Sequence, residues 1–109
     1  MDRVSGRFEL YELVKKIPKG RCAGYGSVGR YLHNPVSGYV AGRWMATCTD
    51  DIPWWRVVAK DGTLVIARRD PEMGIRQREL LEKEGVPFVE DRVDMDAVRW
   101  DPFEEAEGL

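Results

Sequence analysis

The chain has two thiols, on Cys22 and Cys48, and one imidazole, on His33. A cysteine thiolate can attack an electrophilic carbon or ligate a metal, and a neighbouring imidazole often takes the thiol proton. One histidine and two cysteines have no recognisable ligand spacing, so we expect no metal and no cofactor. We read no secretion signal at the N-terminus and therefore expect reduced thiols rather than a disulfide. We place His33 in a turn or at the surface and assign it no role.

Two adjacent tryptophans, Trp54 and Trp55, stand between Pro53 and Arg56 in the segment "IPWWRVV". Neighbouring side chains on an extended chain point to opposite sides, so only one of the two indoles is expected to line a given pocket. An indole offers an aromatic face on which a nucleic-acid base can stack. Trp54 is therefore a candidate pocket wall, with burial in a strand as the alternative, and burial is the favoured interpretation of Trp55.

Charge is unevenly distributed along the chain, although the formal net charge is only −2. Between Glu12 and Asp50 there is no acidic residue, which indicates a positive face that contacts phosphates, the alternative being a chance fluctuation of the surface. Its basic residues are Lys15, Lys16, Lys19, Arg21, Arg30 and Arg43. Acidic residues gather in the tail "EDRVDMDAVRWDPFEEAEG", and we expect about residues 90–109 to form an acidic, solvated, partly disordered C-terminal extension.

The length and composition of the chain are those of one domain. With 109 residues, of which 43% are hydrophobic, it can build a single core, so we expect residues 1–109 to form one domain. No stretch approaches the roughly 18 apolar residues of a membrane span. We expect an intracellular protein without a membrane partner.

Three helices are predicted in the first half of the chain. Apolar residues recur at three- and four-residue steps over residues 8–17, and "IPKG" ends that helix. Ser27 is predicted to cap a short helix over residues 28–32, and a third helix is predicted over about residues 36–47. Two short helices joined by a tight turn are typical of a helix-turn-helix, with residues 36–46 as the helix that enters a DNA groove.

A hairpin and a fourth helix are predicted in the second half. Two β-branched runs flank Asp61-Gly62 in "WRVVAKDGTLVIARR", which predicts a β-hairpin wing. Pro71 near the start and Gly85 at the end then bound a helix. The predicted fold class is therefore α/β, mostly α: a winged helix-turn-helix DNA-binding domain with a short β-hairpin wing.

The order and spacing of several motifs resemble those of one family. The motifs are "IPKGRCAGYGSVGRYLHNP", "IPWWRVV", "DG" and "RQRELLEKEGV". They resemble the DNA-binding domain of O6-alkylguanine-DNA alkyltransferases over roughly residues 8–87. On that resemblance, Trp54 replaces the nucleophilic cysteine of a Pro-Cys-His-Arg segment and Trp55 replaces the histidine that activates it. Because indole atoms cannot accept an alkyl group as a thiolate can, we expect no catalytic residue and no enzymatic activity.

The chain looks like the alkyltransferase-like branch of this family, in which tryptophan replaces the cysteine. The resemblance implies binding of O6-alkylguanine in double-stranded DNA by nucleotide flipping, no alkyl transfer, and hand-over to nucleotide-excision repair proteins. A flipped base needs an apolar pocket, in which aromatic stacking offsets the cost of extrusion. We expect a monomer that is cytoplasmic, nucleoid-associated when bound to DNA, or nuclear in a eukaryote.

The resemblance also gives roles to side chains near the expected DNA surface. Tyr25 matches a tyrosine that crowds the phosphate 3′ of the lesion, with packing on the core as the alternative. Tyr39 falls where the family has an arginine that fills the gap left by the flipped nucleotide. A tyrosine can wedge between bases but cannot donate the same fork of hydrogen bonds. Arg43, one helical turn later, could contact a phosphate or substitute in part, and Ser27 belongs to the same DNA-binding set.

Two arginines in the second half have different expected roles. Arg69, with Arg68 as the competing choice, matches an arginine that lies over the damaged base through a cation–π contact, and solvated hairpin arginines are the alternative. Arg56 is expected to form a structural ion pair with Glu84 rather than to contact DNA. Two other functions stay open: a winged-helix module that binds DNA or protein without lesion selectivity, and alkyl transfer through Cys22 or Cys48.

Overall fold

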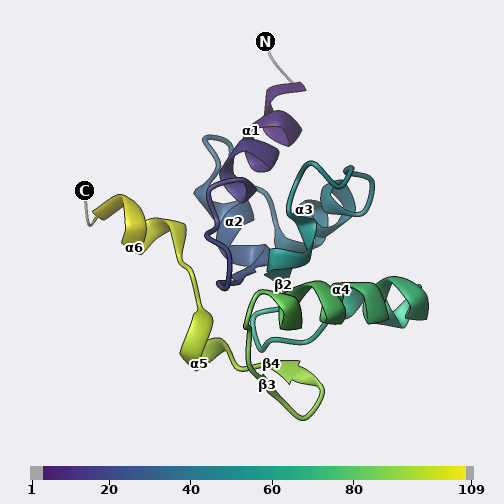
Figure 1. The fold of residues 1–109 in the computed structure, drawn as a ribbon. Coiled ribbons are helices and arrows are strands. Elements are labelled where there is room, and N and C mark those ends of the chain that lie inside the picture. The colour runs from purple at the N-terminus through teal and green to yellow at the C-terminus, as the bar shows by residue number, and fades with distance from the viewer. Residues whose placement is uncertain (1–3, 108–109) are drawn as a thin grey trace.

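The computed structural model describes residues 4–107, so residues 1–3 and 108–109 of the predicted single domain lie outside the described residues. The helices are α1 (Val4–Val14), α2 (Tyr25–Tyr31), α3 (Gly38–Met45), α4 (Pro71–Lys83), α5 (Met95–Val98) and α6 (Pro102–Glu107). Between them lie the 3-10 helices η1 (Trp54–Arg56) and η2 (Val65–Arg68), and the strands β1 (Ala23–Gly24), β2 (Val57–Val58), β3 (Phe88–Val89) and β4 (Arg92–Val93). Helices α1 to α3 gather at one end of the molecule, and α4 lies with β3 and β4 at the other (Figure 1).

The first three helices occur where the sequence predicted them, with different ends. Helix α1 stops at Val14, because the next residues form turns in which Ile17 N donates to Val14 O at 3.0 Å. The prediction that Ser27 caps the second helix is wrong. Gly24 is the N-cap of α2, since the helix begins directly after β1, and Ser27 is the third residue of that helix. Helix α3 is capped by Ser37, whose hydroxyl accepts from Val40 N at 3.2 Å.

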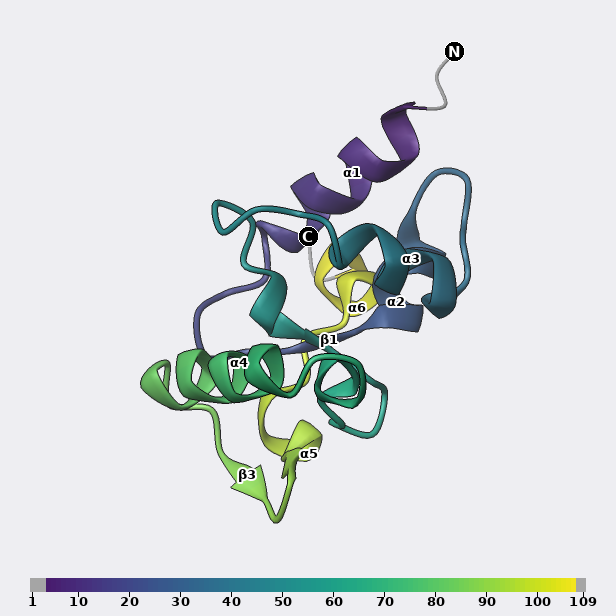
Figure 2. The same ribbon diagram turned by 90° about the vertical axis from the view of Figure 1, so that its right-hand side faces the viewer.

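Glycines let α2 and α3 approach each other closely. A Cβ on Gly29 would lie 2.6 Å from Val36 O, and one on Gly38 would lie 3.1 Å from Gly26 N. Val36 N donates to Gly29 O at 3.0 Å across the same junction. Side chains larger than hydrogen at Gly29 and Gly38 would push the helices apart, so these glycines set the position of α3, which is visible beside α2 in Figure 2.

The predicted hairpin around Asp61-Gly62 is wrong. Strand β2 pairs in parallel with β1, in the register Ala23 with Val57 and Gly24 with Val58. Gly62 does make a turn, at φ 92°, and its N–H donates to Ala59 O at 2.8 Å. The run after the turn continues as η2 instead of a second strand.

Packing against α4 explains the shape of this segment. Ala67 of η2 meets Gly74 so closely that a Cβ on Gly74 would lie 2.3 Å from the Ala67 Cβ. A 3-10 turn brings Ala67 onto the helix, and a local propensity for β structure cannot reveal such a distant partner.

The antiparallel pair in the described chain is β3–β4, in the register Phe88 with Val93. The mostly helical α/β class is nevertheless confirmed.

Helix α4 confirms the predicted start and stop signals. Asp70 caps the helix by accepting from Met73 N at 3.3 Å, and Pro71 occupies the first turn. Gly85 follows the helix at φ 87°, in the left-handed region that glycine adopts at low cost. The ends of α4 could be predicted because they depend on neighbours in the sequence.

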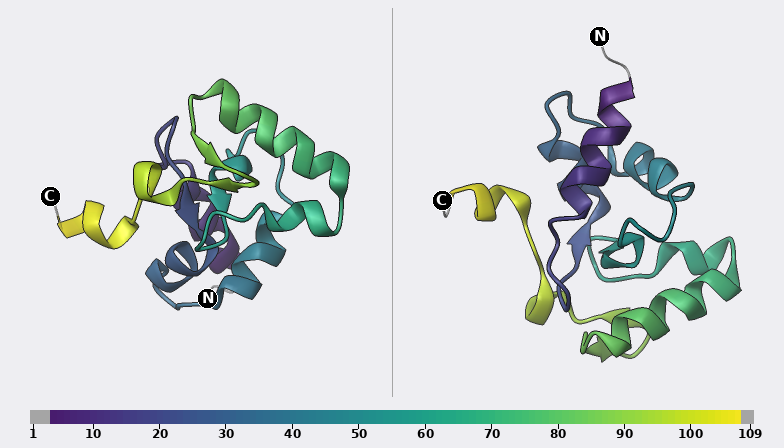
Figure 3. Two further views of the ribbon diagram at one scale, coloured as in Figure 1. Left: turned by 90° about the horizontal axis from the view of Figure 1, so that it is seen from below. Right: turned by 45° about the horizontal axis from the view of Figure 1, so that its top comes forward.

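Up to Glu107 the C-terminal segment folds into β4, α5 and α6, where the sequence suggested a partly disordered extension; the last two residues of that extension lie outside the described residues. Cys22 N donates to Val98 O at 3.0 Å and Trp100 N donates to Cys22 O at 2.7 Å, so the segment runs beside β1 as an additional edge. Trp100 is only 5% exposed. Helix α6 lies on the side of the molecule away from α4 (Figure 3). Apolar residues among the acidic ones are buried and hold the segment in place.

The core has two groups of buried side chains. The first lies between α1, α2 and α3 and includes Leu10, Val14, Val28, Ala41 and Trp54. The second joins β2, α4 and α5 through Val58, Leu81, Val93, Met95 and Val98. Within the described residues, no helix is long and apolar enough to cross a membrane.

Candidate functional site

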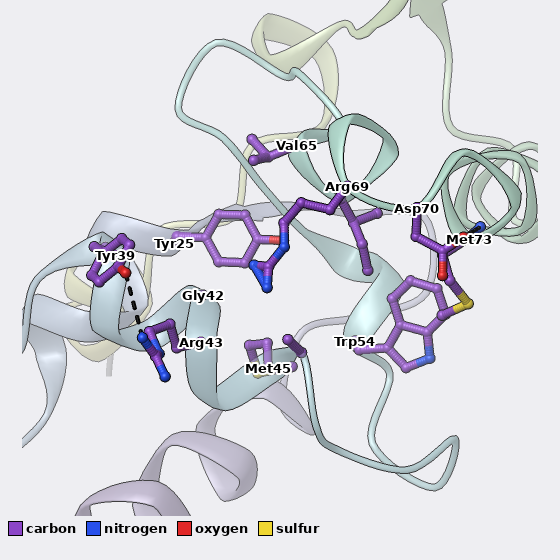
Figure 4. Close-up of a pocket in the computed structure, with 13 residues that line it drawn as sticks. Tyr25, Tyr39, Gly42, Arg43, Met45, Trp54, Val65, Arg69, Asp70 and Met73 are labelled. Atoms are coloured by element: carbon purple, nitrogen blue, oxygen red, sulfur yellow. Dashed lines mark hydrogen bonds between the residues drawn. The ribbon is translucent and has the colours of Figure 1, made fainter.

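A cavity of about 690 Å³ opens between α3 and the segment that joins η2 to α4. We call it the α3 cavity (Figure 4). It brings together five of the six DNA-binding residues named from the sequence: Tyr25, Tyr39, Arg43, Trp54 and Arg69. The other lining residues are Gly38, Gly42, Met45, Ala46, Val65, Ile66, Asp70 and Met73. Ser27 is not part of the lining.

Trp54 belongs both to the core and to the wall of the α3 cavity. It is 7% exposed, so most of its indole is packed inside the molecule. Its Nε1–H donates to Asp50 Oδ1 at 3.0 Å. The two interpretations of Trp54 from the sequence, pocket wall and buried residue, therefore describe one position.

The expectation that Trp54 and Trp55 point to opposite sides of a strand is wrong. Both lie in η1, where successive side chains fan out around a helical turn, and their rings meet edge to face with centroids 5.9 Å apart. Trp55 Nε1–H donates to Glu84 Oε2 at 2.9 Å. Trp55 is thus a partly buried residue fixed by a carboxylate and is not among the residues that line the α3 cavity.

Arg56 forms the ion pair with Glu84 that the sequence suggested. Arg56 Nη2 lies 2.7 Å from Glu84 Oε2, and the two side chains are 14% and 8% exposed. Arg56 Nη1 also donates to Ile17 O at 2.8 Å, and Gly20 N donates to Glu84 Oε1 at 3.2 Å. Burial alone would raise the pKa of Glu84, but the hydrogen bonds from Arg56, Trp55 and Gly20 outweigh it and hold that pKa below its ordinary value.

Tyr25 is the first residue of α2 and lies against α3. Its ring packs on α3 at Gly42, where a Cβ would lie in ordinary van der Waals contact, 3.8 Å from Tyr25 Cδ1. Burial raises the pKa of Tyr25 to about 12, so its hydroxyl stays protonated near neutral pH and can donate a hydrogen bond. The two interpretations of Tyr25 from the sequence, contact with DNA and packing on the core, are therefore compatible, because Tyr25, like Trp54, both packs on the core and lines the α3 cavity.

Tyr39 and Arg43 form an exposed pair on α3, one helical turn apart. Tyr39 is 73% exposed. Arg43 Nη1 donates to Tyr39 Oη at 3.4 Å, and its guanidinium carbon lies 5.9 Å from the centre of the tyrosine ring. An aromatic ring and a cation thus stand together at the edge of the cavity (Figure 4).

Of the two competing arginines, the structure places Arg69 in the lining of the α3 cavity, whereas Arg68 lies outside that lining. Figure 4 shows Tyr25, Trp54 and Arg69 pointing into the space between α3 and the η2–α4 segment. Arg21, in contrast, is engaged elsewhere: its Nε donates to Val98 O at 3.0 Å and its Nη2 donates to Arg99 O. Arg21 therefore supports the C-terminal segment with donors of its guanidinium group.

The two cysteines are poorly placed for nucleophilic chemistry. Burial raises the pKa of Cys22 to about 12 and that of Cys48 to about 11. Since the thiolate is the nucleophile, little of the reactive form exists near neutral pH at either position. Neither cysteine is among the residues that line the α3 cavity.

Sequence reasoning missed the apolar side of the cavity. Met45, Val65, Ile66 and Met73 supply it, and Asp70 adds a carboxylate at the rim. Val65 and Ile66 were assigned to a hairpin, which hid their role. The sequence "RRDPE" did contain a usable signal, because an aspartate before a first-turn proline is typical of a helix N-cap and places Asp70 beside Arg69.

Two helices joined closely through glycines, with an aromatic cavity between the second helix and a following turn, define a mostly helical, winged-helix-like domain. Residues 7–86 match the family described as the 6-O-methylguanine DNA methyltransferase DNA-binding domain. This chain belongs to that family, as the resemblance in the sequence indicated.

Its relatives include alkyltransferase-like proteins. Alkyltransferase-like protein 1 of Schizosaccharomyces pombe is 36% identical over 81 residues, which cover 72% of this chain and 73% of that protein. A DNA base-flipping protein of Vibrio parahaemolyticus is 25% identical over 97 residues, covering 86% of this chain and 94% of the relative.

Solved structures support the same fold. A crystal structure of S. pombe Atl1 in complex with damaged DNA containing O6-carboxymethylguanine aligns with a TM-score of 0.76 at 28% identity, over 94% of this chain and 100% of that one. A second structure, S. pombe ATL in complex with DNA, aligns with a TM-score of 0.76 at 26% identity over the same shares of the two chains. The winged-helix-like fold class predicted from the sequence is confirmed.

Proposed function

We propose that this protein binds O6-alkylguanine in double-stranded DNA, holds the flipped base in the α3 cavity and transfers no alkyl group. The observation that carries the proposal is the cavity itself, in which Tyr25, Trp54 and Arg69 converge beside the exposed pair on α3. Trp54 stands where the resemblance places the family's nucleophilic cysteine. The position that holds the nucleophile in the family therefore contributes an aromatic surface for binding in this protein.

The size and lining of the α3 cavity suit a flipped base. Its volume, about 690 Å³, lies within the range of ordinary ligand pockets. Trp54 and Tyr25 supply aromatic surface, and Met45 and Met73 adapt readily to the shape of a ligand. Stacking of one base on an aromatic side chain is worth about 1–3 kcal/mol, which is comparable with the cost of extruding a base from the duplex.

The α3 surface suits a DNA groove. Tyr39 and Arg43 project from its exposed side, and Arg30 of the neighbouring α2 is also exposed. Wedging aromatic side chains kink DNA at the step where they insert, and arginine neutralises phosphate charge nearby. The solved relatives in complex with DNA support DNA binding by the present chain.

The absence of alkyl transfer follows from the chemistry of the residues present. An indole at position 54 cannot replace a thiolate, and the raised pKa values of Cys22 and Cys48 leave both thiols protonated. A protein that binds the lesion but leaves the alkyl group attached must pass the damage to another system. The proposal therefore includes recruitment of nucleotide-excision repair proteins to the marked site.

A binding titration tests the proposal. Fluorescence anisotropy with two duplexes that differ in one O6-methylguanine, at one salt concentration, should show tighter binding of the damaged duplex. Trp54→Ala should lower the free-energy preference for the damaged duplex by about 1–3 kcal/mol, whereas Trp54→Phe should retain most of that preference. Mass spectrometry of the protein after incubation should show no added alkyl mass. Equal affinity for the two duplexes would refute lesion recognition.

One observation favours a second candidate function, a winged-helix module that binds DNA or a protein without lesion selectivity. Tyr39 occupies the position at which the family resemblance expects an arginine, so the fork of donors toward the orphaned base is missing. Equal binding of both duplexes, with a strong salt dependence, would support this candidate instead.

A further inference from the structure

The loop between α3 and η1, residues 46–53, contains an acceptor for the buried indole of Trp54. The Trp54 Nε1–H is the only polar group of that side chain, and it donates to Asp50 Oδ1 at 3.0 Å. The loop continues directly into η1, where Trp54 N donates to Ile52 O. Asp50 therefore holds the far edge of an indole whose other edge borders the α3 cavity.

The second carboxylate oxygen of Asp50 connects the loop to another element. Asp50 Oδ2 forms an ion pair and hydrogen bond with Arg76 Nη2 of α4. The first turn of α4 supplies Met73 to the cavity lining, and Figure 4 shows Met73 beside Trp54. One carboxylate thus joins the wall of the cavity to the helix that borders it.

We propose that Asp50 is a positioning residue that fixes the orientation of Trp54 in the lesion-binding cavity, and that Arg76 holds Asp50 in place. This inference rests on the function proposed above. Figure 4 shows the indole nitrogen on the edge of the ring that faces away from Tyr25. With its donor occupied on that edge, Trp54 presents carbon atoms to a bound base.

The chemical consequence concerns the ligands that the wall accepts. A wall of aromatic carbon recognises a base by stacking and makes no hydrogen bond to a particular O6 substituent. Core packing and the edge-to-face contact with Trp55 confine the ring of Trp54, and the hydrogen bond to Asp50 determines where its donor edge lies. Without Asp50 the N–H of Trp54 would lose its protein acceptor, and nothing in the loop would fix which edge of the ring carries the donor.

Two substitutions at Asp50 separate its hydrogen bond from its charge. Asp50→Ala and Asp50→Asn each remove one negative charge, but only asparagine keeps an oxygen that can accept from Trp54. Asp50→Ala should lower the damaged-to-undamaged affinity ratio about tenfold, whereas Asp50→Asn, which keeps the acceptor for Trp54 but loses the ion pair with Arg76, should lower it only about threefold. Glu12→Gln is the matched control, since it removes one negative charge from another exposed ion pair on α1, and it should leave the ratio unchanged.

Arg76→Gln tests the second half of the inference. It should lower the ratio about threefold, and the double variant Asp50→Ala/Arg76→Gln should be no worse than Asp50→Ala alone, because Arg76 acts through Asp50. Thermal unfolding of each variant checks that the fold survives. If Asp50→Ala does not fold, Arg76→Gln still tests the inference, because it leaves the acceptor of the Trp54 indole in place.

The outcomes distinguish this inference from the proposed function. If the unmodified protein binds both duplexes equally, the proposed function is refuted and this role of Asp50 with it. If it prefers the damaged duplex and Asp50→Ala keeps that preference, only the role of Asp50 is refuted. Loss of the preference in Asp50→Asn to the same degree as in Asp50→Ala would also overturn it, since the effect would then follow charge.

Discussion

At the scale of residues, the two adjacent tryptophans of η1 have different roles. Trp54 faces the α3 cavity while remaining largely buried, and Trp55 donates its N–H to Glu84. On the resemblance, these positions hold a nucleophile and the base that activates it. An indole has no proton to exchange near neutral pH, so Trp55 donates a hydrogen bond to the carboxylate of Glu84 but cannot act as a general base.

Tyr39 offers a test of whether an aromatic wedge is sufficient. If the exposed tyrosine already stacks between bases, Tyr39→Arg should change the damaged-to-undamaged affinity ratio by less than about threefold, and Tyr39→Ala should weaken binding of the damaged duplex by about 1–3 kcal/mol. Both effects are measured in the anisotropy titration used for the unmodified protein.

A different result with Tyr39 would favour the second candidate function. A gain in lesion preference of tenfold or more in Tyr39→Arg would show that the arginine's donors are needed and that the natural site lacks selectivity. Arg30→Gln is a suitable control, because it removes a neighbouring exposed charge and should weaken binding to both duplexes equally.

At the scale of elements, the sequence predicted what depends on near neighbours. Helix α4 has its proline start and glycine stop where expected, and α3 lies within the predicted range. The hairpin prediction around Gly62 failed because each of its two runs has another partner. Val57–Val58, before the turn, pairs in parallel with β1, and Ala67, after the turn, packs on α4. The cavity residues named from the family resemblance converge, whereas Met45 and Met73 could not be found without the fold.

Glu84 ties three elements together, and its ionisation should be visible in the stability of the protein. It accepts from η1 through Trp55 and Arg56, and from the turn before β1 through Gly20. Its pKa in the folded state lies below the ordinary value of 4.5. The stabilisation by Glu84 is therefore fully present above the unfolded pKa and is lost as the pH falls through the lower folded pKa.

Glu84→Gln should reveal this pH dependence. At pH 7 the variant should be about 3 kcal/mol less stable to urea, because it leaves Arg56 largely buried without its counter-charge. The difference from the unmodified protein should shrink as the pH falls from the unfolded pKa of 4.5 through the lower folded pKa, because Glu84 then takes up a proton on unfolding. Glu82→Gln, on an exposed pair of the same helix, should show little effect at any pH. A difference that stayed constant down to pH 3 would contradict the role of the ionised carboxylate.

At the scale of the whole molecule, the C-terminal segment completes the core instead of trailing from it. Cys22 lies between the segment and β2, and its backbone N–H and C=O both bond to the segment, through Val98 and Trp100. Arg21 adds two side-chain bonds to the carbonyls of Val98 and Arg99. The acidic composition hid this arrangement, because the charged residues occupy exposed positions between the apolar ones that anchor the chain.

The anchor can be tested with two aromatic residues of the same segment. Trp100→Ala should lower the free energy of unfolding by about 3–5 kcal/mol, since it empties a large buried site. Phe103 is exposed and meets Tyr31 edge to face, so Phe103→Ala should cost about 1 kcal/mol or less. Urea unfolding followed by circular dichroism measures both changes.

Trp100→Ala should also speed the labelling of Cys22 by a thiol reagent. Since a native stability of about 5–15 kcal/mol is typical, the loss is a large fraction of the total, and global opening becomes more frequent. Equal, small losses in both variants would show that the segment is dispensable and that the core closes without it.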